Sequence, residues 1–123
     1  MRGRQLHKGE GRTRICLTVE SLGDDTVVCI YNKSAHIGAV AVGDYDLKED
    51  RTSVSVITRS GHKDDTIAQR AAYLISKHTK NPSCVIAGVH LDNISTEEIQ
   101  KLVVNSEMLV NEFLKLHGST NIG

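Results

Sequence analysis

The fold is decided by residues 53–90, which read SVSVITRSGHKDDTIAQRAAYLISKHTKNPSCVIAGVH. Apolar and polar residues alternate over residues 53–58, as in a strand with one buried face. Apolar residues then recur at helical spacing over residues 65–78. A short apolar run follows at residues 83–89 and predicts a strand at the centre of the sheet. A strand–helix–strand unit normally has parallel strands and a right-handed connection, so we expect these two strands to run parallel.

Three further strands are predicted upstream of this unit. Residues 13–20 alternate between apolar and polar, residues 27–31 are largely apolar, and residues 36–42 form a run rich in glycine and alanine. Turn sequences separate these segments, so the first four strands are expected to form an antiparallel meander.

The last element is a helix with a clear beginning. Ser95 and Glu98 have the spacing of a capping box, and Gly118 is expected to end the helix. The predicted class is therefore α+β (α/β), with a mostly antiparallel sheet of about five strands and two helices. The order of elements is ββββαβα, with the fourth and fifth strands parallel.

Length and composition indicate one domain. The chain has 123 residues, 39% of them hydrophobic and 24% charged, which suits a globular protein with its own core. We expect residues 1–12 to be a flexible basic arm, residues 13–117 a single α/β domain and residues 118–123 a tail. The arm could also clamp an anionic ligand or partner.

Charge and cysteine usage exclude several classes of protein. The formal net charge is zero and aromatic residues make up 3% of the chain, so a general nucleic-acid binder is not expected. No apolar run approaches the length of a membrane span. The three cysteines, Cys16, Cys29 and Cys84, each lie in an apolar run and are expected to be reduced thiols of a cytoplasmic protein.

Three of the six histidines are predicted to share one edge of the sheet. His36 begins the third strand, whereas His62 and His90 follow the ends of the fourth and fifth. If the fourth and fifth strands are parallel and the third is antiparallel to them, these ends meet. The two helices also begin at this edge, and a helix N-terminus favours phosphate or carboxylate.

Other interpretations of this edge remain open. Its histidines could be ordinary surface residues, and its aspartates could be caps and turn formers. His36, His62 and His90, with Asp92, could instead bind zinc. A nucleophilic enzyme is not indicated, because no serine or cysteine lies in a recognisable catalytic motif.

Three blocks, HIGAVA at 36–41, SVSVIT with GHKDD within 53–65, and AGVHLDNI at 87–94, resemble a small subunit of gallate decarboxylase. That small protein typifies the prenylated flavin chaperone LpdD-like family, and the resemblance covers residues 13–116. It implies a fold related to proteasome assembly chaperones. Carried over position by position, it points to cofactor binding at His36, Gly38, Gly61, His62, Lys63, Asp64, His90, Asp92 and Asn93.

The resemblance implies a non-catalytic accessory protein that carries prenylated FMN, or FMN, for a UbiD-type decarboxylase. It also implies a homodimer or higher homo-oligomer, and neither a membrane nor a nucleic acid is an expected partner. One alternative is a dimeric interaction protein resembling assembly chaperones, without a small ligand. A further alternative is a metal-dependent hydrolase that uses His36, His62 and His90.

Overall fold

The computed structural model describes residues 4–59 and 62–122, with the backbone alone for residues 62 and 118–122. The strands are β1 (Arg4–Lys8), β2 (Ile15–Leu22), β3 (Asp25–Tyr31), β4 (Ala39–Asp46), β5 (Arg51–Thr58) and β6 (Ser83–Gly88). The helical elements are the 3-10 turn η1 (Gly11–Thr13) and the α-helices α1 (His62–Thr79) and α2 (Thr96–Ile122). The predicted α+β class is confirmed.

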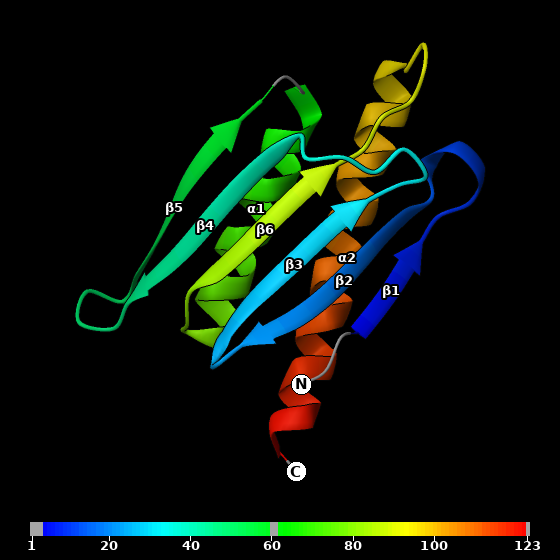
Figure 1. Cartoon of the computed structure of the whole chain (residues 1–123). Helices are drawn as coiled ribbons and strands as arrows, with labels where there is room; N and C mark the ends of the chain where they lie inside the picture. Colours follow the sequence, from blue (N-terminus) through cyan, green and yellow to red (C-terminus); the bar gives the residue numbers. More distant parts are fainter. Residues whose placement is uncertain (1–3, 60–61, 123) are drawn as a thin grey trace.

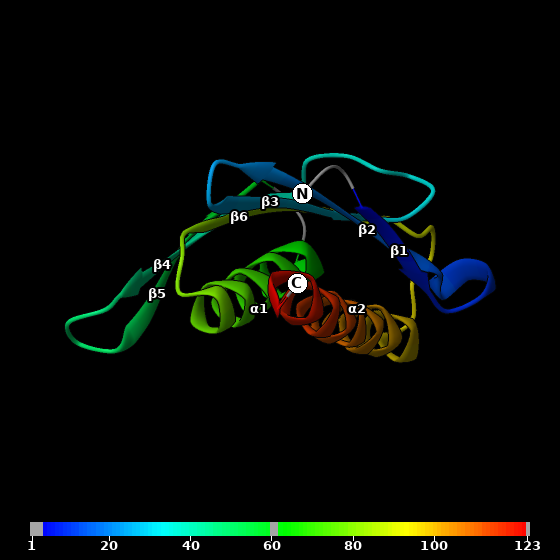
Figure 2. The ribbon, with the colours of Figure 1, turned by 90° about the horizontal axis from the view of Figure 1, so that it is seen from below.

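The strands form one six-stranded mixed sheet in the order β1-β2-β3-β6-β4-β5. Both α-helices cover the same face of this sheet, and the opposite face carries no helix (Figures 1 and 2). We call this opposite side the open face. No helix in the described part of the chain combines the length and apolar character needed to cross a membrane.

The core lies between the sheet and the two helices. Alternate residues of β2 and β3 are buried, because successive side chains of a strand point to opposite faces. On the helix side they meet Ile67 and Ile75 of α1, and Leu109 and Phe113 of α2, all of which are buried. The core is almost wholly aliphatic, as the low aromatic content predicts.

The packing of α1 on the sheet explains why β4 is rich in small residues. A Cβ atom at Gly43 would lie 2.6 Å from the backbone oxygen of Ala72, so the helix approaches the strand closely. The Ser76 and Ser83 hydroxyls form a buried hydrogen bond of 2.8 Å beneath this contact. Ser83 also donates to the Ala72 oxygen over 3.2 Å, which satisfies the buried polar groups there.

The sheet has six strands rather than the expected five. Residues 4–8, expected to lie in a flexible arm, form β1 and pair antiparallel with β2. Leu6 packs against the core, and Lys8 forms an ion pair with Glu112 of α2. The backbone of α2 also continues past Gly118 to Ile122. One glycine costs a helix only about 1 kcal/mol and does not oblige it to end.

The predicted pairing of the fourth and fifth strands is wrong. β5 and β6 are not neighbours, because β4 lies between them and is antiparallel to both. β6 instead pairs parallel with β3, which interrupts the expected meander between β3 and β4. An apolar strand is best buried with a neighbour on each side, and α1 carries the chain past β4 to reach that position. β5 and β6 nevertheless run in the same direction.

Candidate functional site

Four strand ends meet at one edge of the sheet, which we call the histidine edge. Ala39, at the start of β4, lies opposite both Thr58 at the end of β5 and Ala87 near the end of β6. Tyr31, at the end of β3, lies opposite Gly88. The segments that contain His36 and His90, together with the start of α1, therefore leave the sheet at this edge.

Asp64 of α1 is buried at the histidine edge and contacts two of its segments, through Val89 and His36. Its side chain is 1% exposed, and its Oδ1 accepts the backbone N–H of Val89 over 3.1 Å. Its Oδ2 lies 3.4 Å from Nε2 of His36 and has no hydrogen-bond partner. Gly38 leaves room for this carboxylate, because a Cβ atom there would lie 2.6 Å from Cγ of Asp64.

His90 forms a second, separate pair with an aspartate. Its Nε2 lies 3.0 Å from Oδ1 of Asp92, and both side chains are largely exposed. Asn93 has a φ of 51°, a conformation that asparagine tolerates well, so it shapes the turn before α2. Lys63 is half-buried in the first turn of α1.

The structure therefore separates the predicted ligands into two His–Asp pairs. Within the described side chains, no three histidine, cysteine or acidic residues lie close enough to hold a metal ion. The side chain of His62 is outside that description, and Gly61 lies outside the described residues altogether. The zinc site considered from the sequence thus has no support in the described part of the edge.

Both helix N-termini carry acidic groups of their own. Ser95 and Glu98 form the predicted capping box, with reciprocal hydrogen bonds of 3.1 Å. At α1, Asp65 accepts the backbone N–H of Thr66 over 2.7 Å. These carboxylates complement the positive end of each helix dipole, so the helix N-termini are weaker anion sites than the sequence predicts.

A hollow of about 890 Å³ lies beside the histidine edge. We call it the roofed hollow, because the connection from β3 to β4 rises above the open face in Figure 2. It is lined by Gly11, Arg12, Arg14, Cys16, Tyr31, Asn32, Lys33, Ser34, Ala35, His90, Leu91 and Asp92. Of the predicted site residues that the structure describes with their side chains, His90 and Asp92 belong to this lining.

Sequence reasoning did not name Arg14, Lys33 or Tyr31 as residues of a site, although all three line the hollow. Arg14 and Lys33 are exposed cations, and Tyr31 is half-buried. Tyr31 lies opposite Cys16 in the sheet, and its hydroxyl accepts a hydrogen bond from Gln5 over 3.3 Å. A cation stands next to the start of the first predicted strand and another next to the end of the second, and the predicted antiparallel pairing already makes these ends neighbours. Only the fold shows that His90 lies beside them, because β6 pairs with β3.

Asn32 holds the roof of the hollow in place. Its side chain is buried, its Nδ2 donates to the backbone oxygen of His90 over 2.9 Å, and its Oδ1 accepts the backbone N–H of His90 over 3.2 Å. The same oxygen accepts the N–H of Ser34 over 3.1 Å. One side chain thus joins the β3–β4 connection to the segment that follows β6.

Asn32→Ala is expected to lower the free energy of unfolding by ~1–2 kcal/mol, because three hydrogen bonds to backbone groups are lost together. Asn32→Asp keeps the two accepted bonds but places a carboxylate oxygen against the backbone oxygen of His90 at a buried site, so it too should be less stable than wild type. Chemical denaturation measures both changes. Equal stability of Asn32→Ala and wild type would show that the clamp contributes nothing.

Arg12 joins η1 to the start of α2. Its Nε donates to Glu98 over 2.7 Å, and a terminal nitrogen donates to the backbone oxygen of Asp92 over 2.8 Å. Hydrogen bonds from Arg12, and then from the backbone of Ser95, lower the pKa of Glu98 from 4.5 to about 2. This contact closes one wall of the roofed hollow.

Glu98→Gln is expected to lower the melting temperature at neutral pH and to lose that effect in acid. A lowered pKa stabilises the fold fully above 4.5, and this stabilisation disappears as the pH falls towards about 2. Melting temperatures of variant and wild type should therefore converge over that window. Glu97→Gln, in the same helical turn, is the control, and a difference independent of pH would contradict the assignment.

The fold, a six-stranded sheet with both α-helices on one face, is similar to that of a chain in a solved chaperone complex. That structure is described as "Crystal Structure of a Novel Chaperone Complex for Yeast 20S Proteasome Assembly". It matches with a TM-score of 0.65 at 13% sequence identity, covering 97% of this chain and 98% of that chain. At this identity the likeness concerns the fold alone.

The family model of the prenylated flavin chaperone LpdD-like domain matches residues 9–117. The chain belongs to this family, as the resemblance predicts. No curated protein matches the chain.

Proposed function

We propose that the protein is a non-catalytic carrier that binds prenylated FMN, or FMN, and delivers it to a decarboxylase of the UbiD type. The observation that supports this most is the roofed hollow beside the histidine edge. Its volume of about 890 Å³ lies within the range of small-molecule sites. Family membership supports an accessory chaperone role.

The chemistry of the lining suits an anionic flavin. Arg14 and Lys33 supply exposed positive charge for a phosphate group, and the hollow contains one carboxylate, that of Asp92. Tyr31 offers an aromatic surface for a flat ring system, and His90 offers a ring nitrogen as hydrogen-bond partner. Bound prenylated FMN would serve as the cofactor of the partner enzyme. The role of this chain would be to hold the flavin and release it to that enzyme.

Titration of the purified protein with prenylated FMN tests the proposal, with FMN and riboflavin as comparisons. Prenylated FMN and FMN, which carry a phosphate group, should bind, whereas riboflavin, which lacks the phosphate, should bind weakly. An Arg14→Glu/Lys33→Glu variant should weaken binding at least ~100-fold, which corresponds to ~2.7 kcal/mol. His90→Ala should weaken the binding of prenylated FMN, FMN and riboflavin by the same factor, because His90 is proposed to contact the ring system rather than the phosphate.

Lys48→Glu/Lys115→Glu is the control, since it makes the same change in charge away from the hollow. Absence of binding by wild type would remove the proposal. Transfer is tested by mixing the loaded protein with a flavin-free UbiD-type decarboxylase and measuring the activity gained.

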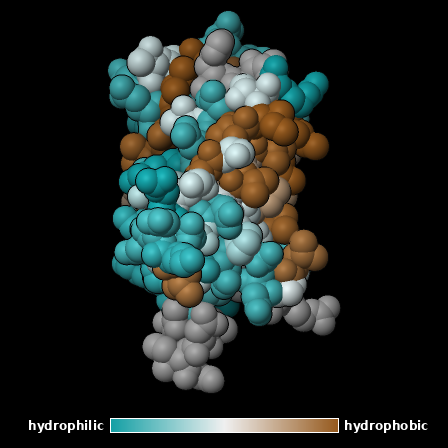
Figure 3. Space-filling view, turned by 90° about the vertical axis from the view of Figure 1, so that its left-hand side faces the viewer, coloured by the Kyte–Doolittle hydropathy of each residue, from teal (hydrophilic) through white to brown (hydrophobic). Residues whose placement is uncertain are grey.

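A second candidate function, a dimeric interaction protein, is favoured by the open face. Figure 3 shows apolar side chains gathered on the flank formed by β4 and β5. Val42 and Ile57 are 49% and 71% exposed there. Exposed apolar patches of this kind typically mark contact surfaces. Sedimentation of Val42→Glu/Ile57→Glu against wild type tests this candidate, and a monomeric wild type would exclude the homodimer.

A further inference from the structure

β5 is an unusually open edge of the sheet. It pairs with β4 on one side and stands at the end of the strand order, with no strand beyond it in the described chain. Its eight residues, RTSVSVIT, carry no charge after Arg51 and no proline or glycine. Proteins commonly protect an edge with charge, proline, a bulge or short length, so an eight-residue edge without these is a template for another strand.

One hydrogen bond shows which backbone groups of β5 point away from β4. The N–H of Arg59 donates to the backbone oxygen of Gly38 over 2.9 Å, towards β4. Backbone groups of successive strand residues point to opposite sides. Those of Thr52, Val54 and Val56 therefore point away from β4 and are available to an added strand.

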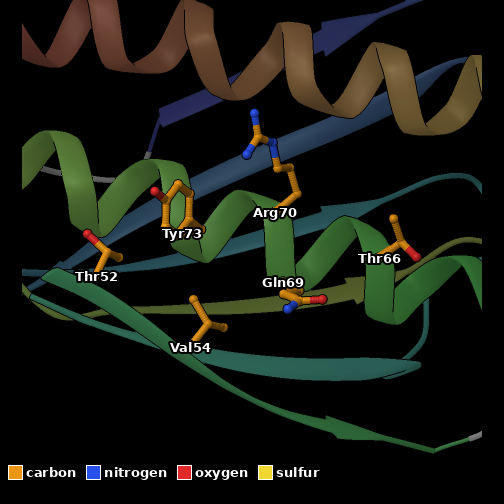
Figure 4. A pocket seen from close by; sticks show the side chains of 6 residues that line it. All are labelled: Thr52, Val54, Thr66, Gln69, Arg70 and Tyr73. Atoms are coloured by element: carbon orange, nitrogen blue, oxygen red, sulfur yellow. The ribbon is translucent and has the colours of Figure 1, made fainter.

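A groove runs beside this edge on the helix side. It has a volume of about 510 Å³ and is lined by Thr52, Val54, Thr66, Gln69, Arg70 and Tyr73. Figure 4 shows that two of these residues come from β5 and four from α1. Side chains of an added strand alternate between the two faces, so every second one would enter the groove.

The groove carries positive charge on its α1 side. Arg70 is the one charged side chain in the described lining, and Lys77 lies two turns further along α1. Arg70 and Lys77 both lie over the ring of Tyr73, at 5.8 and 5.5 Å from its centre, which holds them beside the groove. Arg59, which is exposed, adds positive charge at one end of β5, whereas Asp46, Glu49 and Asp50 precede Arg51 at the other end.

Glu107 of α2 faces Arg70 across 3.5 Å, but both side chains are substantially exposed, so this ion pair is weak. Arg70 can therefore turn to another carboxylate at little cost. A second copy that paired through its own β5 would offer residues 52–58, which carry no charge and so provide no carboxylate for Arg70. Charge complementarity selects a partner whose strand is acidic.

We propose that the β5 edge and its groove dock an extended, acidic segment of a partner protein. The segment adds a strand to β5 through backbone hydrogen bonds. It places an apolar side chain against Val54 and Tyr73 and a carboxylate beside Arg70. This site is separate from the roofed hollow and does not depend on flavin binding.

The test uses a fluorescent nonapeptide, Glu-Thr-Val-Thr-Glu-Thr-Val-Thr-Glu, which presents valine and glutamate on one face. Its counterpart has lysine in place of glutamate. Fluorescence anisotropy should show saturable binding of the acidic peptide and at least ~tenfold weaker binding of the lysine peptide, equivalent to ~1.4 kcal/mol. Hydrogen exchange should show new protection within residues 52–58.

Arg70→Glu should weaken binding of the acidic peptide at least ~tenfold and improve binding of the lysine peptide. Lys101→Glu, an equal change in charge at an exposed position of α2, should leave both unchanged. Val54→Pro removes an outward N–H and should abolish binding, with circular dichroism as the check on folding. Absence of binding, protection elsewhere in the chain, or self-association through β5 would each overturn the proposal.

Discussion

Gly88→Ala is expected to lower the free energy of unfolding by at least ~3 kcal/mol, because no other described glycine would place a Cβ atom so close to backbone atoms. A Cβ atom at Gly88 would lie 2.5 Å from the carbonyl carbon of His36 and closer still to its oxygen. Both are backbone atoms, so no side-chain rotation relieves the overlap. The segment containing His36 must move away from β6, which separates it from Asp64.

Denaturant unfolding followed by circular dichroism measures this effect. Gly23→Asn is the matched control, because Gly23 has a φ of 63° and no atom within 4 Å of its Cβ position. Asparagine tolerates that conformation, so the control should cost less than ~1 kcal/mol. If the proposed carrier function is correct, Gly88→Ala should also weaken flavin binding, since the displaced segment continues from the roof of the hollow. A Gly88→Ala protein as stable as wild type would show that the two segments are not in contact.

Asp64→Ala should cost ~3 kcal/mol, the second largest effect. The N–H of Val89 then has no acceptor in a buried position, which costs ~1–3 kcal/mol, and the removed carboxylate leaves a cavity beneath Gly38. Because the lost group also faces His36, the β3–β4 connection should exchange its amide hydrogens faster. Thermal unfolding and hydrogen exchange measure these two consequences.

Asp64→Asn separates the hydrogen bond from the charge. Nδ1 of His36 donates to the backbone oxygen of Ser34 over 2.9 Å, which leaves Nε2 facing the carboxylate of Asp64 at 3.4 Å. An asparagine amide can accept from Val89 and donate to that nitrogen, whereas alanine can do neither. We therefore expect Asp64→Asn to recover most of the stability lost in Asp64→Ala. A carboxamide variant no more stable than the alanine variant would show that the charge itself is required.

Much of the fold could be predicted from the sequence, because the relevant signals are local. Ser95 and Glu98 predict the start of α2 from spacing alone, and their reciprocal hydrogen bonds are present. The alternation over residues 53–58 and the apolar run at 83–89 likewise correspond to β5 and β6. β1 escaped prediction because its five residues have only Leu6 packed against the core.

The candidate site could be predicted only in part. The histidine edge follows from strand direction. β5 and β6 run in the same direction, as predicted, even though the predicted pairing of β5 with β6 is wrong. The partners within the edge do not follow from direction. Asp64 was expected to offer a polar group to a ligand, but it is buried and engaged with Val89. The hollow also joins Arg14 and Lys33 to His90, residues from three separate segments.

The sequence by itself determined the class of fold, the start of α2, the residues that form β6, and the family. Periodicity, capping and motif order are properties of neighbouring residues. The tertiary structure alone decided that β6 enters between β3 and β4 and that the β3–β4 connection roofs a hollow. The physical reason is that strand pairing is a competition among all the strands for burial. The winning order depends on how α1 and α2 cover one face, which no single segment encodes.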